Sequence, residues 1–246
     1  MPITIEDYID NPMGGSVLTH RQMYKDMYTE KLNVLMLREN FNYQLFKDES
    51  NDTYYIHLKI PSEVVPKFRY DVVFKFSPPN HVSRGTTNLK KFHCRFFSND
   101  PAFVFTFSHV FFKRGLLVDE LKAKLPRKAI TTAPSEKNPN QQVGYVKSFY
   151  FAYLLMNRAN LFDANKYSAK YTRTYLIRNV QYANETIKLR QELGTAIEKA
   201  EKEEYKAKKS KIETKAKRKT NQPIKTSVKS APKASKTKST KRTKRR

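Results

Sequence analysis

The sequence of 246 residues predicts an α+β fold, in which an antiparallel sheet or small barrel of about five strands is flanked by helices. Apolar and polar residues alternate through much of 41–112, which is the pattern of half-buried strands. After Gly115 the apolar spacing becomes helical. Residues 206–246 contain 18 Lys or Arg and very few apolar side chains, so they cannot form a core. We therefore expect a folded body that continues into a long charged helix and a disordered basic tail.

The predicted strands are short runs bounded by polar loops or prolines. In YYIHLKI (54–60), every second side chain from Tyr54 to Ile60 shares one face, and Tyr55, His57 and Lys59 share the other. The run PAFVFTFSHVFF is apolar almost throughout, as expected for a strand that is covered on both faces. The five predicted strands are 41–46, 54–60, 69–76, 91–97 and 101–112.

Helical spacing predicts the remaining elements. A first helix follows Thr19, a second includes Leu117, Leu121 and Leu125 and stops at Pro126, and the next two cover 145–162 and about 167–209. The predicted organisation is an irregular arm over 1–17, an α+β body over 18–195, a projecting charged helix over 196–220 and a disordered cationic tail over 221–246.

The charge of the chain is concentrated at its C-terminal end. Of the net charge of +25, residues 206–246 contribute +17, because they hold 18 cations and a single acid, Glu213. The first 205 residues therefore carry only +8. Such a balance predicts a polyanionic partner, with nucleic acid first and an anionic membrane surface second.

The tail is the predicted binding site. Its lysines and arginines are spaced by Ser, Thr, Ala and Pro, so they can neutralise phosphates but offer nothing rigid that reads base edges. We therefore predict binding without sequence specificity. The residues predicted to contact nucleic acid are Lys215, Lys217, Arg218, Lys219, Lys225, Lys229, Lys233, Lys236, Lys238, Lys241, Arg242, Lys244, Arg245 and Arg246.

Few residues suggest catalysis or a metal site. Cys94 is the single cysteine, and its neighbour His93 faces the other side of a predicted strand, so we expect Cys94 to be a buried apolar residue. Asp71 and Asp100 are the acids best placed for a metal-dependent nuclease site, but the favoured interpretations are a polar-face residue and a turn former. We predict no catalytic residue, no metal and no cofactor.

The strands suggest one further site. Tyr55, Lys59, Lys75 and Arg95 fall on predicted outer faces, where aromatic and cationic side chains can form a stacking platform for single-stranded nucleic acid. The competing interpretation assigns aromatic residues on alternating strands to the core, and it is favoured.

The stretch SNDPAFVFTFSHVFFKRGLLVDELKAKL (98–125), with NPNQQVGYVKSFYFAYLL (138–155) behind it, resembles uncharacterised virion structural proteins of tailed bacteriophages that infect low-GC bacteria. The resemblance extends over roughly residues 40–190, does not include the tail and carries no catalytic motif. It implies a component of the head, connector or tail that is present in many copies or as a ring.

Charge and resemblance together predict a non-catalytic virion structural or assembly protein whose tail contacts DNA. Its other partners would be further copies of itself or other virion proteins, and its location the virion after assembly in the host cytoplasm. The longest apolar-rich run, 149–156, is far shorter than the roughly 20 residues of a membrane span. The alternatives are a free DNA-binding or condensing protein of replication or repair, in the cytoplasm or nucleoid, and an enzyme that processes nucleic acid.

Overall fold

The computed structural model describes residues 2–10, 42–62, 65, 68–79, 85–135, 138–144 and 146–220, and of 207–220 only the backbone. The chain divides into two compact units, Met1–Ile197 and Glu198–Arg246. The elements are α1 (Ile5–Asp10), β1 (Tyr43–Asp48), β2 (Thr53–Pro61), β3 (Arg69–Ser77), η1 (Leu89–Lys91), β4 (His93–Ser98), η2 (Phe103–Phe107), α3 (Ser108–Lys113), η3 (Asp119–Lys124), α4 (Arg127–Thr131), α5 (Lys147–Arg158), η4 (Ala164–Lys166), β5 (Ala169–Lys170), α6 (Arg173–Asn179) and α7 (Ala183–Thr220).

The sheet confirms the predicted α+β fold. Its five strands lie in the order β4-β3-β2-β1-β5, with β4 and β5 at the edges, so it is an open sheet and not a barrel. The four long strands pair antiparallel, as predicted. The fifth strand differs from the prediction, because the two-residue β5 pairs parallel with β1 and makes the sheet mixed.

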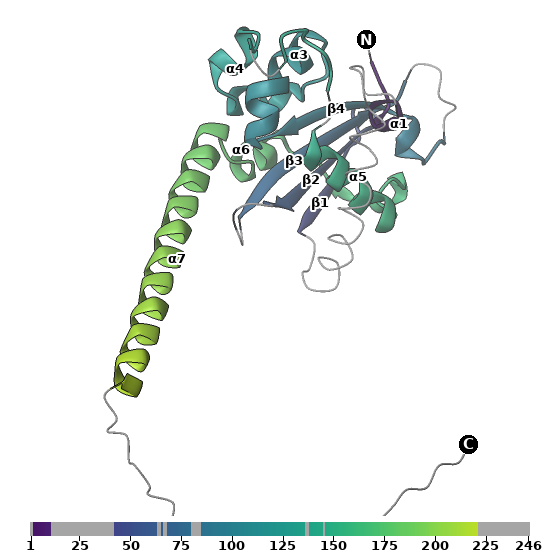
Figure 1. Ribbon diagram of the computed structural model, residues 1–246. Coiled ribbons are helices and arrows are strands. Elements are labelled where there is room, and N and C mark those ends of the chain that lie inside the picture. The colour runs from purple at the N-terminus through teal and green to yellow at the C-terminus, as the bar shows by residue number, and fades with distance from the viewer. Residues whose placement is uncertain are drawn as a thin grey trace, which may run out of the picture. The chain divides into compact units, whose positions relative to one another are not determined.

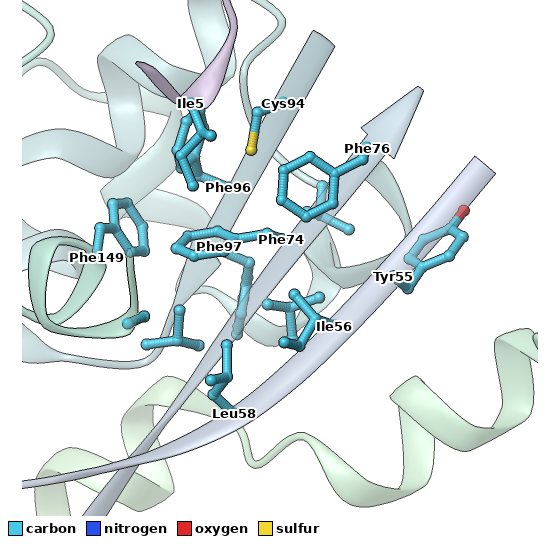
Figure 2. Packing of buried hydrophobic residues seen from close by; sticks show 14 of the residues in the cluster. Ile5, Tyr55, Ile56, Leu58, Phe74, Phe76, Cys94, Phe96, Phe97 and Phe149 are labelled. Carbon is cyan, nitrogen blue, oxygen red and sulfur yellow. The ribbon is translucent and has the colours of Figure 1, made fainter. Parts of the chain in front are cut away.

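One face of the sheet builds an aromatic core. The inward face predicted for β3 is confirmed, since Val72, Phe74 and Phe76 are all fully buried, but residues 71 and 73 on its other face are buried too, so the strand is covered on both faces. Helix α5 packs on β2 and β3 (Figure 1) and brings Phe149 within 5.6 Å of the Phe74 ring, measured between centroids. Figure 2 shows these rings together with Phe96 of β4. Such aromatic pairs contribute about 0.5–1.5 kcal/mol each beyond the apolar area that they bury.

The N-terminal segment is part of this core, which corrects the predicted irregular arm over 1–17 in its described part. Residues 5–10 form α1, and Ile5, Tyr8 and Ile9 are buried. The Tyr8 hydroxyl donates a hydrogen bond to the Gly144 carbonyl oxygen and accepts one from the Val146 amide, both at 3.0 Å. Contacts between residues so far apart in the chain could not be predicted from the local turn residues of the N-terminal segment. The helix predicted after Thr19 lies outside the described residues.

The segment predicted as the fifth strand, 101–112, is helical, and that prediction is wrong. Its start is capped by Asp100, whose Oδ1 accepts the Ala102 amide at 2.9 Å. Its end is closed at Gly115, which has a φ of +69° and lies in a Schellman arrangement where the Leu116 amide reaches the Phe111 carbonyl oxygen at 2.8 Å. A continuous apolar run fits a buried helix as well as a buried strand, so periodicity alone could not decide.

Three predicted helices differ from the structure in their type, their bounds or their continuity. Residues 119–124 form the 3-10 segment η3, and Pro126, which was expected only to stop a helix, is the N-cap of α4. The buried helix predicted over 145–162 is confirmed as α5, with shorter ends. The helix predicted from about Tyr167 is divided into α6 and α7, because Val180 takes an extended conformation between them.

Candidate nucleic-acid interface

The predicted cationic site is only partly described by the structure. Lys215, Lys217, Arg218 and Lys219 lie near the C-terminal end of α7, a helix of 38 residues. The other ten predicted residues, from Lys225 to Arg246, lie outside the described residues. At a rise of 1.5 Å per residue α7 spans about 57 Å, so its cations are distributed along an extended element.

Charge is ordered along α7 in the way that favours a helix. An acid, Glu185, stands in the first turn, while the last two turns contain four cations and no acid. Carboxylates near the N-terminus and cations near the C-terminus each interact favourably with the helix dipole, by about 0.3–1 kcal/mol. All side chains of residues 198–206 are exposed. This part of α7 is therefore maintained by local interactions and leaves its charges in solvent.

The outer-face platform predicted from the strands is covered, which supports the core interpretation. Tyr55, Lys75 and Arg95 do form a row across β2, β3 and β4. Tyr55, however, is 2% exposed, and its ring stacks on Tyr171 at a centroid distance of 3.9 Å. No face of Tyr55 remains open for a base.

The cations of this row are neutralised by η3. Glu120 Oε1 accepts hydrogen bonds from Lys75 Nζ at 2.6 Å and from the Tyr55 hydroxyl at 2.8 Å, and Arg95 pairs with Asp119. Burial acts to raise the pKa of Glu120, but the hydrogen bonds from Lys75 and Tyr55 outweigh it and the pKa is lowered. Burial and the negative charge of Glu120 raise the pKa of Tyr171 to about 12. An anionic ligand would have to displace these carboxylates.

A second polar cluster, centred on Asp71, lies buried on the same face of the sheet. Asp71 Oδ1 accepts hydrogen bonds from His57 Nε2 at 2.8 Å and from Lys59 Nζ at 2.6 Å. Its Oδ2 accepts from Asn99 Nδ2 and from the Gln181 amide, both at 2.9 Å. The sequence had placed His57 and Lys59 on an outer face, but His57 is 3% exposed and Asp71 is 1% exposed.

The Asp71 cluster connects the sheet to the start of α7. The Gln181 amide lies in the break between α6 and α7, and it is bound by Asp71 instead of by a helical carbonyl. Asn99 Nδ2 extends the network to the Thr186 hydroxyl at 2.9 Å. Lys59 is the most exposed of the charged members, at 28% of its side chain. The arrangement satisfies the buried charge of Asp71 and fixes the start of α7 against the sheet, which is a structural task.

The Asp71 cluster predicts a loss of stability in acid. Burial acts to raise the pKa of Asp71, but the hydrogen bond and the charge of His57 and the charge of Lys59 lower it below its ordinary value of 3.8. A lowered folded-state pKa stabilises the fold at pH values above the unfolded pKa, and this contribution is lost as the pH falls through the folded value. We expect that the urea concentration at the unfolding midpoint of the full-length protein decreases when the pH is lowered below 4. For Asp71→Asn this decrease should be smaller. Equal acid sensitivity in both proteins would contradict this assignment.

Two further side chains that could carry chemistry, Cys94 and His109, are buried and half-buried, respectively. Cys94 is 1% exposed on β4, as expected for a buried apolar residue, and burial raises the pKa of its thiol well above the ordinary value. His109 Nδ1 is engaged with the Ile130 carbonyl oxygen at 2.9 Å. Within the described parts of the chain, no group of three His, Cys, Asp or Glu side chains could hold a metal ion.

Comparisons with protein-family models, curated proteins and solved structures found no match to this chain. Over the portions that the structure describes, none of the helices has both the length and the apolar character that crossing a bilayer requires.

Proposed function

We propose that this protein is a non-catalytic structural or assembly protein that binds nucleic acid, most simply DNA, through its cationic C-terminal segment. The observation that carries the proposal is the separation of charge, with +17 on residues 206–246 and +8 on the preceding 205 residues. A polycation of this density releases counterions when it binds a phosphate backbone, which supplies affinity without base recognition.

The arrangement of charge in the folded unit supports the assignment of nucleic-acid binding to the C-terminal segment. Its strand cations Lys59, Lys75 and Arg95 each pair with a carboxylate of the same unit. Those pairs consume charge that would otherwise attract phosphates to the sheet. The cations of the C-terminal segment face only one acid, Glu213, over 41 residues. The long-range electrostatic attraction for a polyanion therefore originates mainly from that segment.

The test of binding is a titration of the full-length protein on two unrelated DNA duplexes of equal length at several salt concentrations. Equal affinity for the two duplexes and a steep loss of affinity with salt are expected, since each neutralised phosphate contributes about −0.9 to the slope of log K against log salt. A strong preference for one duplex would contradict the proposal.

The virion assignment is a separate part of the proposal, and it rests on the resemblance over roughly residues 40–190. It predicts that the protein is present at a fixed stoichiometry in purified particles, as measured by quantitative mass spectrometry. A free DNA-binding protein would be found in the lysate and absent from the particles.

A further inference from the structure

The helical segment 101–113 presents two aromatic rings to solvent. Phe105 is 54% exposed and Phe112 is 36% exposed, whereas Phe103 and Phe111 of the same segment are fully buried. The two exposed rings stand seven residues apart along this one helical segment. They are the only strongly exposed phenylalanines in the described part of the chain.

The backbone of this segment is unusual where Phe105 emerges. Residues 103–107 form a π-helix, a rare conformation that appears mostly as single turns inside α-helices and frequently at functional sites. The buried side chain of Asn138 binds the backbone of this π-helix. Its Nδ2 donates hydrogen bonds to the Thr106 carbonyl oxygen at 3.2 Å and to the Gln142 carbonyl oxygen at 2.9 Å. Asn138 thereby fixes the loop 138–142 against the π-helix.

That loop contains a second unfavourable conformation. Gln141 has a φ of +50°, a left-handed conformation that costs about 1–2 kcal/mol for a residue with a Cβ. Its Oε1 accepts a hydrogen bond from Lys113 Nζ at 3.3 Å. The side chain is thus positioned at an open pocket of about 410 Å³ that is lined by Val110, Lys113, Arg114, Asn140 and Gln141. Strain of this kind persists where the surrounding structure imposes it, and it is concentrated at ligand sites.

The surface around these residues is cationic. Residues 101–134 contain six Lys or Arg, of which all but the buried Lys124 can reach solvent, and two acids, Asp119 and Glu120. Both acids pair with sheet cations, Arg95 and Lys75, so they do not neutralise this segment. Lys122 Nζ lies over the Phe112 ring, 4.0 Å from its centroid, which places positive charge on one face of this ring.

We propose that Phe105, Phe112, Lys113, Arg114 and Gln141 form a binding surface for single-stranded nucleic acid. The inference rests on the proposed function and adds a second, structured site to the cationic segment. Exposed rings stack on unpaired bases and cations neutralise the backbone, which together hold single strands in many proteins. A duplex hides the faces of its bases, so the aromatic rings favour a single strand. The amide of Gln141 offers hydrogen bonds to a base edge.

The test uses the full-length protein with Phe105→Ala and Phe112→Ala, singly and together. The probes are a short oligothymidylate, a duplex of the same length, and vesicles that contain phosphatidylserine. Titrations are made at a salt concentration at which the duplex no longer binds, because salt weakens the phosphate contacts of the cationic segment more than stacking. Tyr43→Ala is the matched control, since Tyr43 is an exposed aromatic residue on β1, at 37%.

Each substitution is expected to weaken oligothymidylate binding by about 5–150-fold, as loss of one stacked base does. The duplex affinity of these variants at low salt should stay within twofold of that of the parent. The oligothymidylate affinity of Tyr43→Ala should also stay within twofold of that of the parent. If the variants bind the oligonucleotide like the parent while loss of the cationic segment abolishes duplex binding, the surface is wrong and the proposed function stands. If the parent binds no nucleic acid, the proposed function itself fails. If the variants lose vesicle binding instead, the partner is a lipid surface and the inference is overturned.

Discussion

Replacing Asp71 with alanine is expected to destabilise the folded unit by about 3–5 kcal/mol, the range found when one partner of a buried ion pair is removed. The carboxylate accepts hydrogen bonds from His57, Lys59, Asn99 and the Gln181 amide. Alanine removes the acceptor of all four donors, and it leaves the buried His57 Nε2 and the Gln181 amide without this hydrogen bond. Urea unfolding of the full-length protein measures this loss as a lower midpoint.

A matched control separates the buried network from the loss of any acid. Asp163 caps η4 by accepting the Asn165 amide at 3.0 Å, and Asp163→Ala should cost about 0.5–2 kcal/mol, as loss of a helix cap does. Asp71→Asn keeps the shape and some hydrogen bonds, so its cost should lie between the two. If Asp71→Ala unfolds at the same urea concentration as Asp163→Ala, the Asp71 cluster does not stabilise the fold in the way described.

Truncation after Tyr205 is expected to have the largest effect on binding. It removes 18 cations and one acid and leaves the +8 of the first 205 residues. If the segment engages about 6–10 phosphates, the full-length protein should show a slope of roughly −5 to −9 in log K against log salt, and a loss of about 10³–10⁵ in duplex affinity between 50 and 200 mM salt. The truncated protein should bind weakly at all salt concentrations and show a shallow slope.

The truncation leaves the first compact unit, Met1–Ile197, intact. Its urea midpoint should therefore match that of the full-length protein, which is the internal control for folding. Tight duplex binding by the truncated protein would assign recognition to the folded unit and would contradict the role given to the C-terminal segment.

The four antiparallel strands could be predicted because their periodicity is unambiguous. In β3 the apolar side chains at Val72, Phe74 and Phe76 alternate as a sheet face requires, and all three are buried. Residues 101–112 could not be assigned, because a continuous apolar run lacks the alternation that distinguishes a strand from a buried helix. The decisive signals were local, namely Asp100 before Pro101 as a helix cap and Gly115 as a helix end.

The Asp71 cluster could not be predicted, because its members are brought together by strand register. His57 and Lys59 share a face of β2, and the pairing of Lys59 with Asp71 follows only when β2 and β3 are aligned. The sequence indicated that face as exposed, since its polar residues alternate with apolar ones. The segments that cover it, η3 and 171–186, lie more than 40 residues further along the chain.

The exposed surface on 101–113 had no sequence signal once that run was interpreted as a strand. Phe105 was then an ordinary buried position. Phe105 lies within the π-helix, whose Thr106 carbonyl oxygen is bound by Asn138, and no periodicity encodes either feature. Structural strain at Gln141 likewise appears only in the backbone.

The central claim is that the C-terminal segment binds nucleic acid through its positive charge. The mere presence of the segment and the order of its residues do not determine the binding. The most direct measurement compares three full-length proteins on one duplex at several salt concentrations: the parent, a variant with the fourteen predicted Lys and Arg residues replaced by Gln, and a variant in which residues 221–246 are shuffled. We expect the shuffled protein to reproduce the steep slope of the parent, because composition is unchanged, and the Gln variant to lose most of it. A Gln variant that binds as tightly as the parent, or a shuffled protein that fails to bind, would contradict the claim.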